Sequence, residues 1–409
     1  MSEVSAVQRR TIAVLSAGQV LGGISFGATV SLGAVLAAQI SGDDALSGLA
    51  TAAITLGTAL TAVPLAALAR ARGRRPALAT GMTVALGGVG LVIAAVATGS
   101  FPLLLVAFAL IGAGQAANLQ SRFAATDLAT DASRGRDLSI VVWTTTLGAV
   151  LGPNLVGPGE VLGDQLGMPS LTGPYLFTVV AQALGIALYL VALRPDPLVM
   201  AQQLVAGHDS QADRIVRADR PRVARYATAA IVGAHGVMVS IMAMTPIHLL
   251  HHGATLTIVG LTISLHIAGM YALSPVFGLL ADRWGRVRTI LLGCGILGGC
   301  VGVIALDQDD SAAVTVALVL LGLGWSAVTV AGSALLTEAS AENLRTQRQG
   351  RNDFLMSLVA AVGATGAGGL LSWVGFAGLA LFALPVIVAI VALTPLARAS
   401  VSPTSFEGG

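Results

Sequence analysis

Two long apolar segments of this chain are joined by the stretch Gly278-Leu-Leu-Ala-Asp282-Arg283-Trp-Gly285-Arg286-Val-Arg288. The stretch crowds four charged side chains into seven residues of an otherwise apolar region. Charged groups are costly inside a lipid bilayer, so this stretch must lie at a membrane face. Gly285 allows the chain to reverse with a positive φ, and loops rich in arginine lie on the cytoplasmic side. We therefore predict a tight cytoplasmic turn between two membrane helices.

The composition is that of a membrane protein. Of the 409 residues, 55% are hydrophobic and 10% are charged, and the mean hydropathy is +0.84. Soluble domains carry about 25% charged residues. The 22 basic residues are all arginine, which we take to indicate a GC-rich bacterial genome. Cys294 and Cys300 fall on different faces of one apolar segment, so we expect both to pack in the interior without a mutual disulfide.

Apolar segments of about 20 residues or more can cross the ~30 Å hydrocarbon core as helices. We predict an all-α fold with twelve such helices, at about 11–40, 45–69, 76–98, 101–126, 138–158, 174–193, 226–250, 256–281, 287–306, 312–337, 352–373 and 376–397. Residues 1–193 and 226–409 then form two six-helix bundles, joined by a polar cytoplasmic linker at 194–225.

The distribution of charge provides a test of this topology. With the N-terminus inside, the arginine-containing loops fall on the cytoplasmic side, and the outer loops carry acidic residues such as Asp43, Glu160 and Asp307. This pattern obeys the positive-inside rule, and a missed helix would invert every later loop. We predict a multi-pass protein of the cell membrane with both termini in the cytoplasm.

The two halves of the chain repeat each other at an offset of about 210 to 216 residues. The matched positions are Gly73 with Gly285, Gly112 with Gly322, Thr126-Asp127 with Thr337-Glu338, Arg134 with Arg345, and Gly135 with Gly350. A six-plus-six duplication of this kind is typical of transporters, in which the substrate site lies between the halves near the bilayer midplane.

The stretch Gly278–Arg288 resembles the signature loop between the second and third helices of each half in the major facilitator superfamily (MFS) of transporters. The first-half copy keeps Gly73, Arg74 and Arg75 but has Ala66 and Arg70 where the family has glycine and aspartate. Over nearly its whole length the chain resembles a twelve-helix member of this superfamily. The family's arginine motif in the fourth helix is absent; Phe108 takes its place.

A second motif lies in the expected helix at 138–158. Gly148, Gly152, Pro153 and Gly157 resemble the glycine–proline motif of the family's proton antiporters, which implies a drug- or metabolite–proton antiporter-like branch. Small residues also let neighbouring helices approach closely, and proline can kink a helix. Simple helix packing therefore remains an alternative interpretation.

We expect a cytoplasmic gate, built from Arg70, Arg74, Arg75, Asp127, Arg134, Asp137, Gly278, Asp282, Arg283, Gly285, Arg286, Glu338, Arg345 and Asp353. Asp282 is expected to face the positive N-terminus of the helix at 138–158. The expected ion pairs are Arg283 or Arg286 with Asp137 or Asp127, Arg74 or Arg75 with Glu338, and Arg70 with Asp353. Such contacts form only when the inner side is closed, so they favour an outward-facing state. The alternative is that these arginines only set the topology.

Candidate residues for a central cavity are polar groups deep in the expected helices. His235 and His266 each lie about ten residues into a helix, or ~15 Å deep, and histidine can carry a proton near neutral pH. The other candidates are Gln19, Gln115, Asn118, Arg122, Asn154, Met238 and Trp325. Each histidine has an alternative as a neutral packing residue, and Arg122 has an alternative as a side chain reaching the inner surface.

The leading interpretation is a secondary active transporter that works by alternating access and exports a small hydrophobic or weakly cationic solute in exchange for protons. The alternative is an uptake permease, by proton symport or uniport; a receptor or scaffold with the same fold is a further alternative. We expect no enzyme activity, because no nucleophile or metal constellation is evident, and no P-loop, because lysine is absent. We also expect no cofactor, no metal and no nucleic acid, and a monomer in the lipid bilayer.

Overall fold

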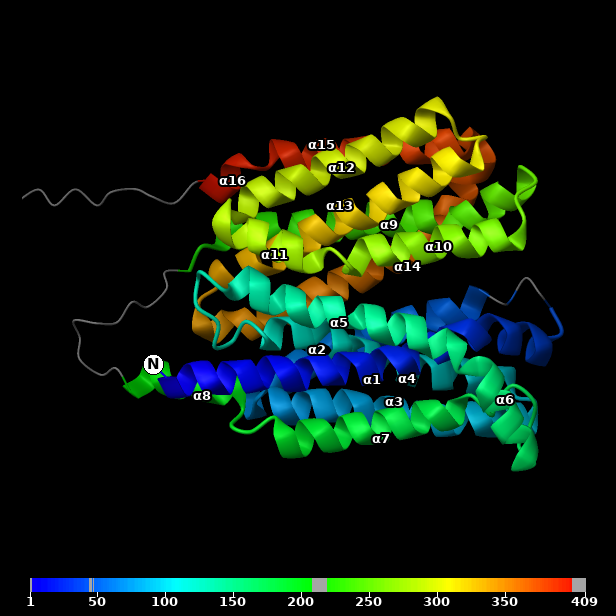
Figure 1. Ribbon diagram of the computed structural model, residues 1–409, viewed down its shortest axis with the longest axis horizontal. Coiled ribbons are helices and arrows are strands. Elements are labelled where there is room, and N and C mark those ends of the chain that lie inside the picture. Colours follow the sequence, from blue (N-terminus) through cyan, green and yellow to red (C-terminus); the bar gives the residue numbers. More distant parts are fainter. Residues whose placement is uncertain (1, 44–45, 47, 208–218, 399–409) are drawn as a thin grey trace, which may run out of the picture.

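A computed structural model describes residues 2–43, 46, 48–207 and 219–398 of the chain. These residues form helices and no strand (Figure 1). In chain order the helices are α1 (Ser2–Ser41), α2 (Gly48–Arg72), α3 (Arg74–Thr98), α4 (Phe101–Ala124), α5 (Arg134–Asn154), α6 (Val156–Gln165), α7 (Tyr175–Ala192), α8 (Pro197–Gly207), α9 (Pro221–His251), α10 (Leu256–Tyr271), α11 (Ser274–Arg283), α12 (Arg286–Leu306), α13 (Ser311–Glu338), α14 (Glu342–Leu381), α15 (Leu384–Ala392) and α16 (Pro395–Arg398).

The helices form two halves that lie side by side (Figure 1). In the first half α1 packs against α5 and α7, and in the second half α9 packs against α13 and α14. The halves meet where α2 contacts α14 and where α5 contacts α11. The linker predicted at 194–225 contains α8, which contacts α1, α2 and α3; its residues 208–218 lie outside the described part of the chain.

The described residues hold nine segments that are long and apolar enough to cross a membrane. One of these, Glu342–Ala397, contains a break at Gly375, whose φ is 71°, and so provides two crossings. α1 and α5 complete a set of twelve crossings at the expected places along the chain. The predicted twelve-helix, all-α membrane fold is therefore confirmed.

Two expected helices are broken in the structure. The helix expected at 256–281 is divided into α10 and α11, and Pro275 stands in the first turn of α11, where its missing N–H is tolerated. The helix expected at 138–158 begins earlier, at Arg134, and ends at Asn154, directly after Pro153; α6 then follows. The predicted disturbance at Pro153 is thus an end of the helix instead of a kink within it.

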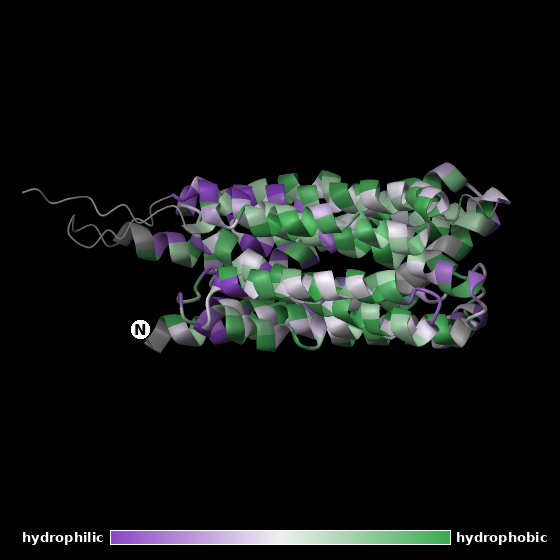
Figure 2. Ribbon diagram, turned by 90° about the horizontal axis from the view of Figure 1, so that it is seen from above, coloured by the Kyte–Doolittle hydropathy of each residue, from purple (hydrophilic) through white to green (hydrophobic). Residues whose placement is uncertain are grey.

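Hydrophilic residues gather mostly toward the two ends of the bundle, while its middle is largely hydrophobic (Figure 2). One end carries the turns at Arg70–Arg75 and Arg283–Arg288 and the starts of α5, α9 and α14; we call it the arginine-rich end. Along the sides, large apolar side chains are exposed, for example Val191, Trp373 and Leu306. Exposed apolar surface on this scale is expected where lipid is the solvent.

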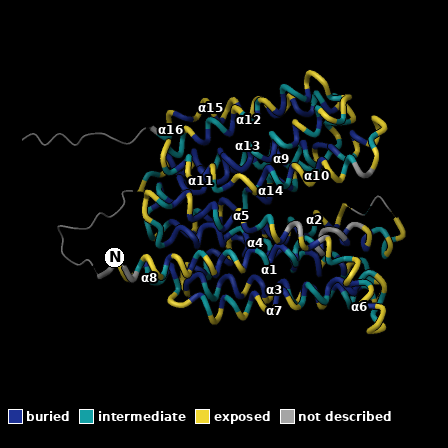
Figure 3. Tube along the Cα trace, viewed as in Figure 1, coloured by how far each residue is buried: buried dark blue, intermediate teal, exposed yellow. Residues whose placement is uncertain are grey.

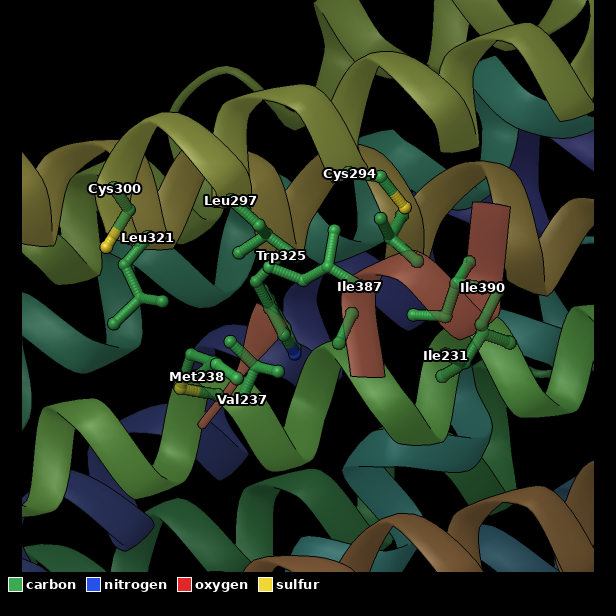
Figure 4. Packing of buried hydrophobic residues seen from close by; sticks show 14 of the residues in the cluster. Ile231, Val237, Met238, Cys294, Leu297, Cys300, Leu321, Trp325, Ile387 and Ile390 are labelled. Carbon is green, nitrogen blue, oxygen red and sulfur yellow. The ribbon is translucent and has the colours of Figure 1, made fainter. Parts of the chain in front are cut away.

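The interior is closely packed, with buried positions along the facing sides of the helices (Figure 3). The largest buried cluster of the described residues lies almost entirely in the second half, where Leu297, Trp325 and Ile387 come from three different helices (Figure 4). Cys294 and Cys300 belong to this cluster and are both free and buried. The prediction that the two cysteines serve packing is confirmed.

Candidate functional site

The contact between α11 and α5 is centred on Asp282. Its two carboxylate oxygens accept hydrogen bonds from the backbone amides of Gly135, at 2.8 Å, and Arg136, at 2.7 Å. Both amides lie in the first turn of α5, where they have no acceptor within the helix and where the helix dipole favours an anion. The structure thus places Asp282 at this helix N-terminus, as expected from the sequence.

Glycine makes this approach of α11 to α5 feasible. A Cβ atom on Gly278 would overlap the side chain of Ser139 and the carbonyl oxygen of Gly135. The turn that follows α11 runs through Gly285, whose φ is 109°, a conformation that glycine adopts without strain. The signature stretch therefore combines a close helix contact, a capping carboxylate and a reversal of the chain.

Arg286 connects three segments at the arginine-rich end. It pairs with Asp282 at 2.5 Å, donates to the carbonyl oxygen of Asp131 at 2.7 Å and lies 3.6 Å from Glu338. The expected pairing of Arg283 or Arg286 with Asp137 or Asp127 is therefore wrong. Arg283 is exposed. Asp137 instead accepts from Gln8 at 2.9 Å and from Arg136 at 3.2 Å, because α1 begins nine residues earlier than expected and brings Gln8 to it.

Arg74 makes a buried contact between the halves. Its guanidinium binds both carboxylate oxygens of Asp127, at 2.8 and 3.1 Å, and donates to the side chain of Gln349 at 2.6 Å. The expected pairing of Arg74 or Arg75 with Glu338 is wrong. Glu338 pairs with Arg220 at 3.1 Å. The physical reason is the position of Arg74. It is the first residue of α3, and there it lies beside Asp127, which follows the end of α4 in the same half.

The backbone of Arg75 has a separate partner, since its amide donates to Asp196 at 2.7 Å. Asp196 also accepts from the amides of Leu198 and Val199 and so caps the start of α8. One carboxylate of the linker thus ties the start of α3 to the start of α8.

The contact between α2 and α14 has a different chemistry. Gly350 packs against Ala66, and Arg70 is exposed. Asp353 is fully buried and accepts from Arg122 of α4 at 2.5 Å. The expected Arg70–Asp353 pair is therefore wrong, because Asp353 lies well inside α14 and faces α4 instead of the end of α2. Arg122 does not reach the inner surface; it bridges the two halves.

The two repeat-related loops have the same internal ion pair. Arg134 pairs with Asp131 at 2.7 Å, and its counterpart Arg345 pairs with Glu342 at 2.8 Å. The repeat-related residues Thr126 and Thr337 contact each other across the interface, with 3.4 Å between their hydroxyl oxygens. The polar contacts between the halves that the structure describes gather toward the arginine-rich end.

An aromatic group from three helices of the second half lies within electrostatic range of Arg122. The indole N–H of Trp325 donates to Nδ1 of His235 at 2.9 Å, and the rings of Tyr271 and Trp325 meet edge to face at 5.8 Å. Trp325 extends from α13 toward Met238 and Val237 of α9 (Figure 4). Arg122 interacts electrostatically with both His235 and Tyr271. We call Arg122, His235, Tyr271, Trp325 and Asp353 the central cluster.

The remaining cavity candidates lie elsewhere. His266 is fully buried and its Nδ1 contacts the carbonyl oxygen of Leu318 at 2.8 Å, so it packs between α10 and α13. Asn118 packs against Gly22 of α1. Gln115 lines a small space within the first half, Gln19 is buried, and Asn154 is exposed at the end of α5.

The glycines of the helix-5 motif have separate environments. Gly148 lies against Gly23 and the carbonyl oxygen of Val20 in α1, so a Cβ atom there would collide with backbone. Gly152 is buried within α5, whereas a Cβ on Gly157 in α6 would meet open space. Close helix packing therefore accounts for Gly148, and the structure adds no contact that requires glycine at 157.

Several members of the site were not anticipated from the sequence, Tyr271, Gln349 and Gln8 among them. Tyr271 ends α10, Gln349 accepts from Arg74, and Gln8 binds Asp137. An aromatic residue four positions before a proline at a helix break is a signal for Tyr271 that the sequence does contain. The sequence contains no such signal for the two glutamines, because only tertiary packing determines which partner lies beside each of them.

Comparison with known proteins agrees with this arrangement. The family model described as Major Facilitator Superfamily matches residues 15–253 and 226–408. The chain is 38% identical to the MFS-type transporter YddS of Bacillus subtilis, over 86% of this chain and 83% of that protein. It is 31% identical to the riboflavin transporter RfnT of Brucella anthropi, over 85% of each chain.

Solved structures share the fold. The human organic anion transporter MFSD10 superimposes with a TM-score of 0.75 at 15% identity, covering 94% of this chain and 99% of that one. The transporter FucP in its outward conformation superimposes with a TM-score of 0.69 at 15% identity, covering 96% and 99%. The chain is a multi-pass membrane transporter, not an enzyme, and it belongs to the major facilitator superfamily.

Proposed function

We propose that this protein is a proton-coupled exporter that works by alternating access and that the structure corresponds to its outward-facing state. The observation that carries the proposal is the buried Arg122–Asp353 ion pair, which joins α4 of one half to α14 of the other. The capping of α5 by Asp282 adds a second contact between the halves at the same end. The positive-inside rule assigns the arginine-rich end to the cytoplasm, so these contacts close the cytoplasmic side.

Asp353 is our candidate for the group that takes up the coupling proton. A carboxylate inside a membrane span is a functional candidate by default, and this one is held by a single cation from the opposite half. One of its oxygens has no hydrogen-bond partner among the described residues. Protonation would remove the negative charge from the pair and leave Arg122 buried without a counter-ion. Leaving one member of a buried pair uncompensated costs about 3–5 kcal/mol, enough to shift the equilibrium toward the inward-facing state.

His235 stays a second candidate for the proton. The indole of Trp325 donates to its Nδ1, so this nitrogen is an acceptor and the ring proton is on Nε2. A second proton on Nδ1 would require the Trp325 hydrogen bond to break. Protonation of His235 would change a contact within the second half, whereas protonation of Asp353 changes a contact between the halves. This difference is why we place Asp353 first.

The central cluster supports a hydrophobic or weakly cationic solute. Trp325, Tyr271 and Met238 provide aromatic and polarizable surface, and the single arginine is already paired with Asp353. Aromatic faces bind flat rings and cations, whereas a sugar phosphate or dicarboxylate needs several unpaired cations. The second candidate function is uptake of a planar aromatic metabolite, which the riboflavin transporter among the relatives favours.

Proton movement in proteoliposomes tests the proposal. The lumenal pH is followed under an imposed pH gradient while lipophilic cations, dyes and riboflavin are added one at a time. We expect a substrate-dependent proton flux in the parent protein, loss of that flux in Asp353→Asn, and retention of it in the matched control Asp164→Asn, whose residue is exposed in α6. Substrate exchange without a gradient should survive in Asp353→Asn.

The outcomes separate the alternatives. Unchanged proton flux in Asp353→Asn would exclude this carboxylate as the coupling group, and the same assay with His235→Ala would then test the histidine. Substrate movement without proton flux in the parent protein would overturn proton coupling. Solute moving with the proton instead of against it would establish the uptake alternative.

A further inference from the structure

A groove between α9 and α14 lies apart from the central cluster. It has a volume of about 630 Å³ and is lined at one end by Arg225, Arg348 and Arg351 and further along by Thr228, Val232 and Leu355. The arginines come from the first turns of α9 and from the part of α14 nearest the arginine-rich end. The groove therefore has a cationic mouth and an apolar floor.

The position of the groove along α14 shows which solvent it meets. Leu358 and Val362 continue the stripe of Arg351 and Leu355 on the same side of this helix, and their side chains are 41% and 65% exposed. Large exposed apolar residues at this spacing mark the lipid-facing side of a membrane helix. Gly350 and Asp353, on the opposite side of α14, contact the first half. The groove therefore opens toward the bilayer.

The depth of the groove matches one leaflet. Val232 lies eleven residues after Pro221, the first residue of α9. At the rise of an α-helix this distance is ~16 Å, about half of the ~30 Å hydrocarbon core. The groove thus runs from the membrane surface at the arginine-rich end to near the middle of the bilayer.

Two of the three arginines at the mouth have no acidic partner among the described residues. Arg348 is held by Asp219 through two contacts, at 2.6 and 2.7 Å, and its hydrogen bonds lower the pKa of the Asp219 carboxyl. Arg225 and Arg351 are exposed and form no ion pair with any residue in the described part of the chain. A net positive mouth on an apolar groove complements an amphipathic anion.

We propose that this groove binds an anionic phospholipid of the leaflet at the arginine-rich end. The phosphodiester contacts Arg225 and Arg351, whose guanidinium groups match phosphate geometry, and one acyl chain follows Thr228, Val232 and Leu355. Basic pockets between membrane helices on the cytoplasmic side are suited to anionic headgroups. Such a lipid bridges α9 and α14 and stabilises the second half, whichever solute the protein transports.

Thermal unfolding of the purified full chain in detergent, with added phosphatidylglycerol or phosphatidylcholine, tests the proposal. The groove variant is Arg225→Gln/Arg351→Gln, and the matched control is Arg9→Gln/Arg10→Gln, which removes two exposed arginines from the same end of the first half. We expect phosphatidylglycerol, but not phosphatidylcholine, to raise Tm in the parent and control proteins. In the groove variant we expect phosphatidylglycerol to bind roughly tenfold more weakly, with most of the Tm rise lost.

Two further measurements complete the test. Soluble glycerol phosphate should leave Tm unchanged, because it has no acyl chain; an equal rise with glycerol phosphate would assign the site to a free phosphate and overturn the lipid. Ala229→Phe keeps every charge but fills the groove, and it should abolish retention of phosphatidylglycerol in native mass spectrometry. An equal Tm rise in the groove variant and the control would overturn the proposal.

Discussion

The two most extensive contacts between the halves, α11 with α5 and α2 with α14, occupy equivalent places in the repeat but differ in chemistry. In the first, Asp282 binds the amides of Gly135 and Arg136, and Gly278 allows the helices to touch. In the second, alanine and arginine stand at the positions of Gly278 and Asp282, and the arginine is exposed. The same architecture is therefore held by two different sets of interactions.

The start of the receiving helix explains the difference. α5 begins at Arg134, so the amides of Gly135 and Arg136 lack acceptors within the helix and require an external one. α14 begins at Glu342, so the amide of Gly350, the counterpart of Gly135, lies in the third turn and bonds within the helix. A carboxylate at position 70 would have nothing to cap. The first-half loop thus lacks an aspartate at a position where its partner helix, which is longer at the N-terminus, has no free amide to bind one.

The connection between α2 and α14 is supplemented by buried side chains instead. Arg74 reaches Gln349 across the interface, and Arg122 reaches Asp353 one turn further along α14. These interactions are side chain to side chain, whereas Asp282 binds backbone. The comparison can be tested with a reporter: Thr126→Cys in a Cys294→Ala/Cys300→Ala background, because Thr126 is buried between the halves and becomes accessible to a thiol reagent when they separate.

The largest effect is expected for Arg122→Met, which leaves Asp353 buried and unpaired. The closed state should lose about 3–5 kcal/mol of free energy relative to the open state, and the reporter should be labelled at least about a hundredfold faster. The double variant Arg122→Met/Asp353→Leu should recover most of this loss, because no buried charge remains. Arg70→Met is the matched control and should label like the parent; labelling as fast as in Arg122→Met would refute our assignment of the pair.

A smaller effect is expected for Gly278→Ala, whose methyl group would overlap Ser139 and the backbone of Gly135. Overpacking of this kind costs about 1–3 kcal/mol, and faster labelling of the reporter should follow. The matched variant Ala66→Gly changes the equivalent position of the other contact and should alter labelling only slightly, through helix propensity. Equal effects of the two variants would mean that the contacts are not as different as their chemistry indicates.

The smallest effect is expected for Asp282→Asn, which keeps one acceptor but removes the charge. The difference between a charged and a neutral acceptor is about 1 kcal/mol, so the reporter should be labelled several-fold faster. Arg70→Asp should not slow labelling of the reporter, since the amides of α14 near Gly350 are already bonded within the helix. Slower labelling in Arg70→Asp would contradict the explanation based on helix starts.

Several features were predictable because they depend on local properties of the chain. Helix length, the position of the arginines and the reversal at Gly285 follow from segment hydrophobicity and glycine conformation, and they determined the membrane fold. The position of Asp282 was also predictable, because this carboxylate ends one helix and the helix expected at 138–158 presents a positive N-terminus.

The pairing of the other charges was decided by the tertiary structure. Arginine side chains are long and several carboxylates lie within reach of each at the arginine-rich end, so small differences in where a helix begins select the partner. Packing of α14 against α4 places Asp353 beside Arg122, and Arg74, the first residue of α3, binds Asp127. The sequence by itself determined a twelve-helix transporter with a contact of Asp282 at the start of α5. The central cluster and its ion pair depend on the packing of five helices, which no local pattern specifies.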